Sequence, residues 1–165
     1  MPRTTNTQFA VAVHVLTYLA GAGADRPVSS EALSGSADVN PVYIRRILGP
    51  LREAGLVRSR AGAHGGWELA VDPRRVTLAQ VWRLLQGDDP VLGLHGTNPD
   101  CPVGRSIQQS LVALDRDVAA AIEAELGRTT VADLLPAGIG ARAERGSAQA
   151  ERSSARAEPI TLSRG

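Results

Sequence analysis

The chain has 165 residues, with 18 basic and 17 acidic side chains and a formal net charge of +1. This length suits one domain better than two large ones. No apolar run approaches the roughly 20 residues of a membrane span, and the N-terminus lacks a signal-peptide pattern. A single cysteine excludes an intrachain disulfide framework, so we expect a cytoplasmic protein that makes no membrane contact.

Charge is unevenly spread along the chain. Residues 1–76 hold nine arginines and six acids, whereas residues 77–135 hold four and eight. Within residues 40–60, five arginines stand against Glu53 alone. A basic patch of this kind suits a polyphosphate partner, although an ordinary helical domain with a solvated arginine face is the alternative.

The first expected helix is capped by Thr7 and closed by a loop over residues 21–27. His14 lies in this helix, and we interpret it as a partly buried, hydrogen-bonded structural residue. An apolar stripe of helical period indicates the face that packs on a core; it comprises Phe9, Ala12, Val13, Leu16, Leu19 and Ala20.

Residues 29–55 are typical of a helix-turn-helix. Ser29 and Ser30 open a short helix, and residues 35–39 form the turn after it. Asn40 caps the second helix, Pro41 suits its first position, and Gly55 suits the left-handed residue that ends it. The apolar face of that helix is predicted to be Ile44, Ile47, Leu48 and Leu51, which leaves Arg45 and Arg46 pointing elsewhere.

Two alternating segments follow, residues 56–60 and 67–71, and a glycine-rich loop over residues 61–66 joins them. This pattern predicts a β-hairpin, or wing. Thr77 then caps a helix with Leu78, Val81, Trp82 and Leu85 on one face. The spacing of helices and hairpin is that of a winged helix.

The longest expected helix runs over residues 105–127, after a loop over residues 91–104 whose length suggests a role. Its stripe needs a partner, either a second copy or the chain's own domain; it comprises Ile107, Leu111, Leu114, Val118, Ile122 and Leu126. Residues 129–135 suggest a short capped helix. From residue 136 the apolar density falls and the composition is typical of a disordered tail.

The motifs of the common enzyme classes are absent from the sequence, so we do not expect an enzyme. His95, Asp100 and Cys101 share one loop, but this mixed set is a weak metal signal, and we predict no metal and no cofactor. Cys101 precedes the longest helix beside Arg105, where a thiol can be a redox sensor or simply pack the loop.

A series of residues in and after the predicted helix-turn-helix resembles the Rrf2 family of bacterial winged-helix transcription regulators. The resemblance covers about residues 4–135 and rests on Tyr43-Ile44, Ala54-Gly55-Leu56-Val57, Ser59, Gly62, Gly65-Gly66-Trp67-Glu68-Leu69-Ala70, Asp72-Pro73 and Val76-Thr77-Leu78. It implies a recognition helix in the major groove of a palindromic operator, a wing at the minor groove, and a long helix that forms the dimer interface.

Two departures from the family pattern limit what the resemblance implies. Iron–sulfur members need three closely spaced cysteines, and this chain has only Cys101. Many relatives carry an arginine where this chain has Ala61, and strand alternation decides whether Arg60 replaces it.

The sequence therefore predicts a mainly α protein with a small β-hairpin wing, a winged helix-turn-helix followed by a long C-terminal dimerisation helix. We expect a DNA-binding unit over residues 1–86, an effector loop and dimerisation helices over 87–135, and a tail over 136–165. The predicted function is a homodimeric DNA-binding regulator, a repressor that reads a palindromic double-stranded operator and responds to a thiol oxidant or another effector. The alternative is a winged-helix protein-interaction adaptor.

Specific residues are assigned to each role. The dimer interface is expected at Ile107, Leu111, Leu114, Val118 and Ile122, and the effector or redox site at Cys101. The predicted DNA contacts are Ser29, Ser30, Asn40, Val42, Tyr43, Arg45, Arg46, Arg58, Arg60, His64, Gly65 and Gly66.

Overall fold

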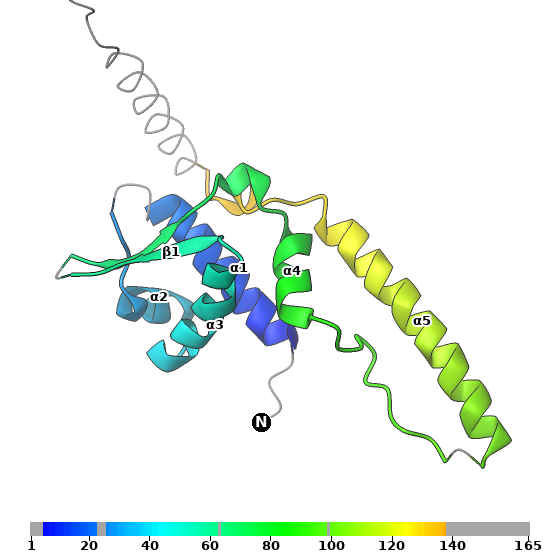
Figure 1. Cartoon of the computed structure of the whole chain (residues 1–165). Coiled ribbons are helices and arrows are strands. Elements are labelled where there is room, and N and C mark those ends of the chain that lie inside the picture. The colour runs from blue at the N-terminus through cyan, green and yellow to red at the C-terminus, as the bar shows by residue number, and fades with distance from the viewer. Residues whose placement is uncertain (1–4, 23–25, 63, 99, 138–165) are drawn as a thin grey trace, which may run out of the picture.

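The computed structural model describes residues 5–22, 26–62, 64–98 and 100–137. Nearly all of the predicted tail, residues 138–165, lies outside these ranges. The fold class is as predicted, mainly helical with one antiparallel hairpin (Figure 1). The elements are α1 (Thr5–Ala22), α2 (Ser30–Ala37), α3 (Pro41–Glu53), β1 (Val57–Arg60), β2 (Gly66–Leu69), η1 (Pro73–Arg75), α4 (Leu78–Gln86), α5 (Pro102–Leu126) and η2 (Ala132–Leu134).

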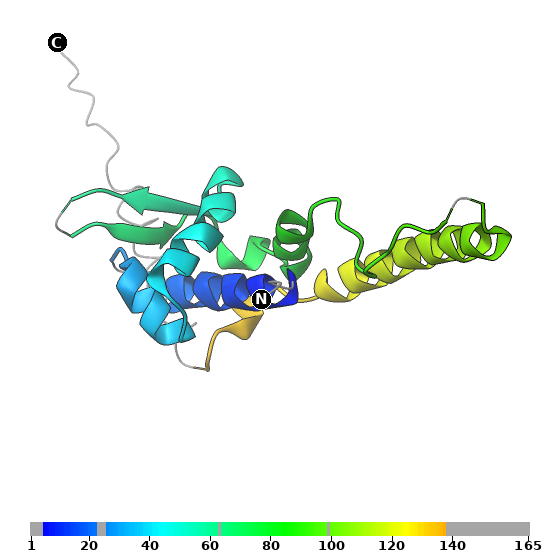
Figure 2. The same cartoon turned by 90° about the horizontal axis from the view of Figure 1, so that it is seen from below.

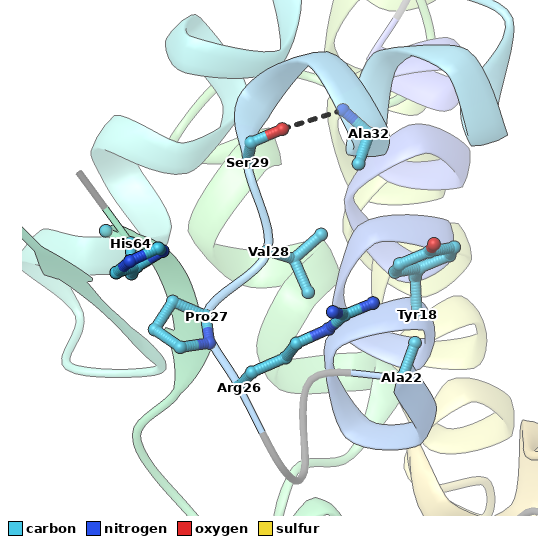
Figure 3. A pocket seen from close by; sticks show the side chains of 9 residues that line it. Tyr18, Ala22, Arg26, Pro27, Val28, Ser29, Ala32 and His64 are labelled. Carbon is cyan, nitrogen blue, oxygen red and sulfur yellow. Dashed lines mark hydrogen bonds between the residues drawn. The ribbon is translucent and has the colours of Figure 1, made fainter.

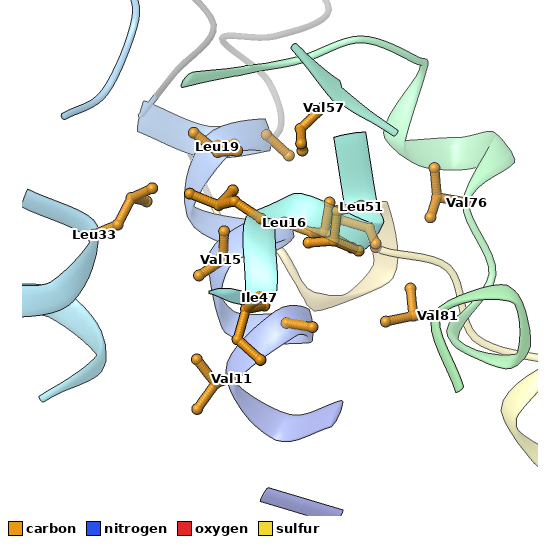
Figure 4. Close-up of a cluster of buried hydrophobic side chains, with 14 of the residues drawn as sticks. Val11, Val15, Leu16, Leu19, Leu33, Ile47, Leu51, Val57, Val76 and Val81 are labelled. Carbon is orange, nitrogen blue, oxygen red and sulfur yellow. The ribbon is translucent and has the colours of Figure 1, made fainter. Parts of the chain in front are cut away.

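Helix α1 supplies the centre of the core, shown in Figure 4, and α2, α3, β1 and α4 pack around it. Val11 and Val15 are buried, whereas Phe9 and Val13 of the predicted stripe are only partly buried. His14 is exposed, which corrects the expectation of a partly buried residue. It is nevertheless hydrogen-bonded, because its Nε2 lies 2.9 Å from Ser36 Oγ.

The helix-turn-helix forms with a shorter turn than predicted. Helix α2 continues through Gly35 to Ala37 and ends at Asp38, which adopts a left-handed conformation with φ of 49°. An aspartate tolerates this conformation because its short polar side chain costs little there. The turn is therefore residues 38–39, not 35–39.

Helix α3 follows its sequence signals closely. Asn40 Oδ1 accepts a hydrogen bond of 2.8 Å from the Val42 N–H, Pro41 occupies the first position, and Gly55 has φ of 72° just after the end. The predicted apolar face is buried along its whole length, with Ile44, Leu48 and Leu51 fully inaccessible. One face of α3 is thus fixed to the core, and the opposite face is left outward.

The hairpin pairs β1 with β2 in antiparallel register, with Arg58 opposite Glu68. A third short piece of extended chain joins it, because Val28 forms a β-bridge with Trp67 through two backbone hydrogen bonds of 2.8 and 2.9 Å. The chain two residues before α2 is therefore attached directly to strand β2 of the wing.

Helix α4 begins with a capping box in which Thr77 and Gln80 exchange hydrogen bonds, and Trp82 packs edge-on against Phe9 of α1. Arg83 Nε donates to Glu123 Oε2 at 2.7 Å, which fastens α4 to α5. Helix α5 starts at Pro102, three residues earlier than predicted, since proline suits a first helical position. None of its 25 residues is buried.

The chain after α5 returns to the core. Val131 is fully buried and its N–H bonds to the Val76 carbonyl at 2.9 Å, while Thr130 bridges Thr77. Because residues 129–131 are committed to this pairing, the predicted capped helix is reduced to the single 3-10 turn η2. No helix within the described residues is long and apolar enough to cross a membrane.

Candidate nucleic-acid interface

The outward face of α3 carries three of the predicted DNA contacts. Val42 is 67% exposed, the Arg45 side chain is 59% exposed, and Arg46 is exposed beside it. Figure 2 shows α2, α3 and the hairpin gathered at one end of the molecule, with the start of α5 at the other. The described structure therefore presents this helix face and the wing on the same end.

Arg45 makes an ion pair with α2. Its Nη2 lies 3.4 Å from Glu31 Oε1, and the Glu31 pKa is lowered by its own backbone N–H, by Ser29 and by Arg45. Glu31 is therefore charged at neutral pH and competes with any phosphate or base for Arg45. Within the described ranges no carboxylate pairs with Arg46, which leaves it as the less restrained of the two.

The wing holds its two arginines on one face. Arg58 and Arg60 are two positions apart in β1, so both point to the side where Glu68 lies on the opposing strand. Arg58 Nε is 2.9 Å from Glu68 Oε2, and Arg60 Nη1 is 3.3 Å from Oε1. The hydrogen bond and charge of Arg58, followed by Arg60, lower the Glu68 pKa. One carboxylate thus offsets half of the wing's positive charge.

The wing glycines serve the chain's own packing. A Cβ atom on Gly66 would lie 2.6 Å from the Val28 carbonyl oxygen, and one on Gly65 would lie 2.2 Å from that of Arg60. A larger residue at position 66 would push the hairpin away from Val28, and one at position 65 would distort the hairpin loop. Trp67 Nε1 completes the attachment by donating to Ser30 Oγ at 3.1 Å.

The other residues of α2 and α3 that were predicted to contact DNA also cap helices or pack within the protein. Ser29 Oγ caps α2 by accepting from the Ala32 N–H, and Asn40 caps α3. Tyr43 is only partly buried and packs against the core cluster. These residues help fix the two helices.

Sequence reasoning did not single out Arg26. It lines a hollow of about 520 Å³ between the end of α1, the start of α2 and the wing, together with Ser29, His64 and Tyr18 (Figure 3). Arg26 and His64 come from segments 38 residues apart that the Val28–Trp67 bridge brings together. Arg26 lies two residues before the bridge residue Val28, outside any helix or strand, so no periodic pattern in the sequence indicated its role.

The predicted dimer stripe lies along α5. Ile107 and Leu114 are 46% and 50% exposed, and Leu111, Val118 and Ile122 are partly exposed. Cys101 is the N-cap of this helix, with Sγ accepting from the Gly104 N–H at 3.4 Å. The preceding loop lies along α5 through Leu92 N–H to Asp115 Oδ1 at 2.6 Å.

Metal-binding groups are sparse in this chain. The residues that the structure describes contain no cluster of three histidine, cysteine, aspartate or glutamate side chains suited to a metal ion. Because the whole sequence has one cysteine, it cannot supply the three thiolates of an iron–sulfur site.

Comparisons with known proteins agree on one family. Residues 5–137 match the family model Rrf2, described as an iron-dependent transcriptional regulator. The putative regulator YwnA of Bacillus subtilis is 35% identical over 79% of this chain and 96% of its own. The repressor NsrR of Streptomyces coelicolor is 32% identical over 70% of this chain and 76% of its own. A putative transcriptional regulator from Lactobacillus plantarum superimposes with a TM-score of 0.67, at 27% identity, over 89% of this chain and 97% of that one.

Proposed function

The chain belongs to the Rrf2 family of DNA-binding transcriptional regulators, and on that basis we propose that it is a homodimeric repressor of an inverted-repeat operator. The observation that carries the proposal is the outward face of α3. Arg45 and Arg46 are exposed on this face, and the helix that carries them is held in place by its caps and its buried face. Arginines on a rigid helix can take guanine edges or hold phosphates.

In this proposal the wing and the start of α2 hold the DNA backbone. Arg58, Arg60 and His64 contribute positive charge or hydrogen bonds at the wing, and Ser29 and Ser30 lie where the first turn of α2 meets phosphate. Arg60 takes the place of the family arginine absent at Ala61, because it shares the face of Arg58.

The proposed dimer is held by the apolar stripe of α5, at Ile107, Leu111, Leu114, Val118 and Ile122. Exposing such an apolar stripe to water along a 25-residue helix costs free energy, which is recovered when a partner covers the stripe. Residues 1–86 would then read DNA and residues 87–135 would set the spacing of the two α3 helices, with Cys101 at the start of α5 as the proposed redox-responsive group.

The adaptor alternative predicts a recognition helix that is turned inward or masked. In the described residues Val42, Arg45 and Arg46 are exposed, which favours operator binding instead. A repressor role is supported by the name of the NsrR relative.

The test begins by selecting bound fragments from the organism's genomic DNA with the full chain. Operator affinity is then measured for Arg45→Ala and Arg46→Ala, each expected to lose about 1–3 kcal/mol where a base contact is removed. Arg116→Ala, an exposed α5 arginine off the apolar stripe, is the matched control and should bind as wild type. Unchanged affinity in the double Arg45→Ala and Arg46→Ala variant would contradict the proposal.

A further inference from the structure

A second cavity, of about 440 Å³, lies along α1. One wall is a face of α1 between residues 10 and 22, with side chains spaced three and four apart, and the other wall is residues 134–136 after η2. Its volume falls within the roughly 300–1,000 Å³ of small-molecule sites. It is separate from the outward face of α3, and the proposed function gives it no role.

The lining of this cavity defines what it can hold. Most of it is apolar, and among the described residues around it there is no arginine, lysine, aspartate or glutamate. The lining therefore offers a charged ligand no arginine, lysine or carboxylate as a counter-charge. Three hydrogen-bonding side chains, His14, Thr17 and Tyr18, lie on the α1 wall.

Thr17 carries an unused polar group. Its Oγ1 is buried and has no hydrogen-bond partner within the described structure, a state that folded proteins seldom leave unexplained. Thr17 lines the cavity, and because a helical threonine populates two χ1 rotamers, a ligand contact would use the rotamer in which its hydroxyl reaches the cavity.

We propose that this cavity binds an uncharged, single-ring organic molecule bearing a hydroxyl or amide group. The ring fills the apolar part of the site, and the polar group bonds to the Thr17 hydroxyl. The lining has no arginine or lysine to pair with an anion, and the unpartnered Thr17 hydroxyl favours a ligand with a polar atom of its own.

An occupant would act on the DNA-binding unit through α2. His14 is bonded to Ser36 in the last turn of α2, and Tyr18 also lines the hollow beside Ser29 and Ala32 in its first turn. Helix α2 in turn pairs with α3 through Glu31 and Arg45. This regulatory step rests on the proposed function, whereas ligand binding does not.

The site is tested first without DNA. Binding of 4-fluorophenol and 4-fluorobenzamide, which are uncharged single-ring molecules with a hydroxyl and an amide group, to the full chain is followed by fluorine NMR. At least one probe should bind wild type, and Ala10→Trp, which fills the cavity from an exposed position, should abolish that binding. Ala124→Trp on the exposed side of α5 is the matched control and should bind as wild type.

Thr17→Val provides a second variant that preserves shape and removes only the hydroxyl. It should weaken probe binding by about two- to tenfold, the effect of one lost hydrogen bond. No binding of any probe to wild type, or binding that survives Ala10→Trp, would overturn the proposed site.

The regulatory step has its own readout. Operator affinity is measured with and without a saturating concentration of the probe that binds, and it should change in wild type but not in Ala10→Trp. Probe binding with an unchanged operator affinity would overturn the coupling through α2. Failure to bind any operator would instead contradict the proposed function and leave the DNA-free result intact.

Discussion

The winged-helix body and α5 have the same kind of sequence pattern but opposite environments. In the body, the apolar positions of α1 and α3 are covered from several sides, and Leu16, Ile44 and Leu48 are fully buried. In α5, apolar residues repeat with equal regularity and none is buried. Periodicity therefore identifies the apolar face of a helix but not what covers it.

The largest expected effect comes from placing a charge on the α5 stripe. Leu114→Asp should dissociate the proposed dimer, because each subunit would bury an unpaired carboxylate at a cost of about 3–5 kcal/mol. Sedimentation at micromolar concentration measures this. Gln109→Asp, on the opposite side of α5, is the control and should remain dimeric. If the wild-type protein is a monomer at that concentration, the proposed dimer through α5 is contradicted.

A core truncation tests the other side of the contrast. Leu48→Ala should lower the free energy of unfolding by about 2–5 kcal/mol, since it leaves a cavity beneath α3, as urea unfolding can measure. Leu114→Ala should act differently, with a loss that depends on protein concentration because its partner is another subunit. Equal, concentration-independent losses in both variants would contradict this difference.

The wing offers a smaller, electrostatic test. Glu68→Gln releases Arg58 and Arg60 and should steepen the salt dependence of DNA binding by about 0.9 for each additional phosphate that the freed arginines neutralise. Glu53→Gln, which removes an equal charge from an exposed position on α3, is the control. A slope unchanged from wild type would show that the two arginines do not reach DNA.

The same ion pairs predict a pH dependence. Because the Glu68 pKa is lowered on folding, first by the Arg58 hydrogen bond, its stabilising contribution is present above the unfolded pKa and is lost as pH falls through the folded pKa. Wild type should therefore be more stable than Glu68→Gln at neutral pH, and the difference should shrink in acid. Thermal unfolding across that range measures it.

Oxidation at Cys101 should have the smallest effect, below about tenfold in operator affinity or 1.4 kcal/mol. A sulfenic acid or disulfide at the N-cap would disturb the hydrogen bond from Gly104 and shift the start of α5. Operator binding is compared before and after mild peroxide for wild type and Cys101→Ser. Equal loss in both proteins would assign Cys101 to packing alone.

Local signals in the sequence predicted the elements well. Asn40, Pro41 and Gly55 located α3, and Thr77 located α4, because caps and terminal residues act within one helical turn. The same logic failed for Thr7, which was predicted to cap the first helix but lies inside α1. It also failed at residues 35–39 and 129–135. There the outcome depended on Asp38 accepting a left-handed conformation and on backbone pairing with Thr77, which is remote in sequence.

The candidate interface was predictable in its charges but not in their pairing. Arg45 and Arg46 could be placed off the apolar face from spacing alone. The restraint of Arg45 by Glu31, the sharing of Glu68 between two wing arginines, and the position of Arg26 all depend on contacts between separate elements. A period of two or 3.6 residues carries no information on such contacts.

The attachment of Trp67 to Ser30 and Val28 has an optical consequence. The chain has two tryptophans; Trp82 is buried against Phe9, whereas Trp67 is half-buried in strand β2 of the wing. Any event that lifts the wing from α2 breaks the hydrogen bond from the Trp67 indole to Ser30 and exposes the Trp67 ring to water. The surroundings of Trp82 stay the same. The intrinsic fluorescence of the protein therefore reports the position of its wing without any added label.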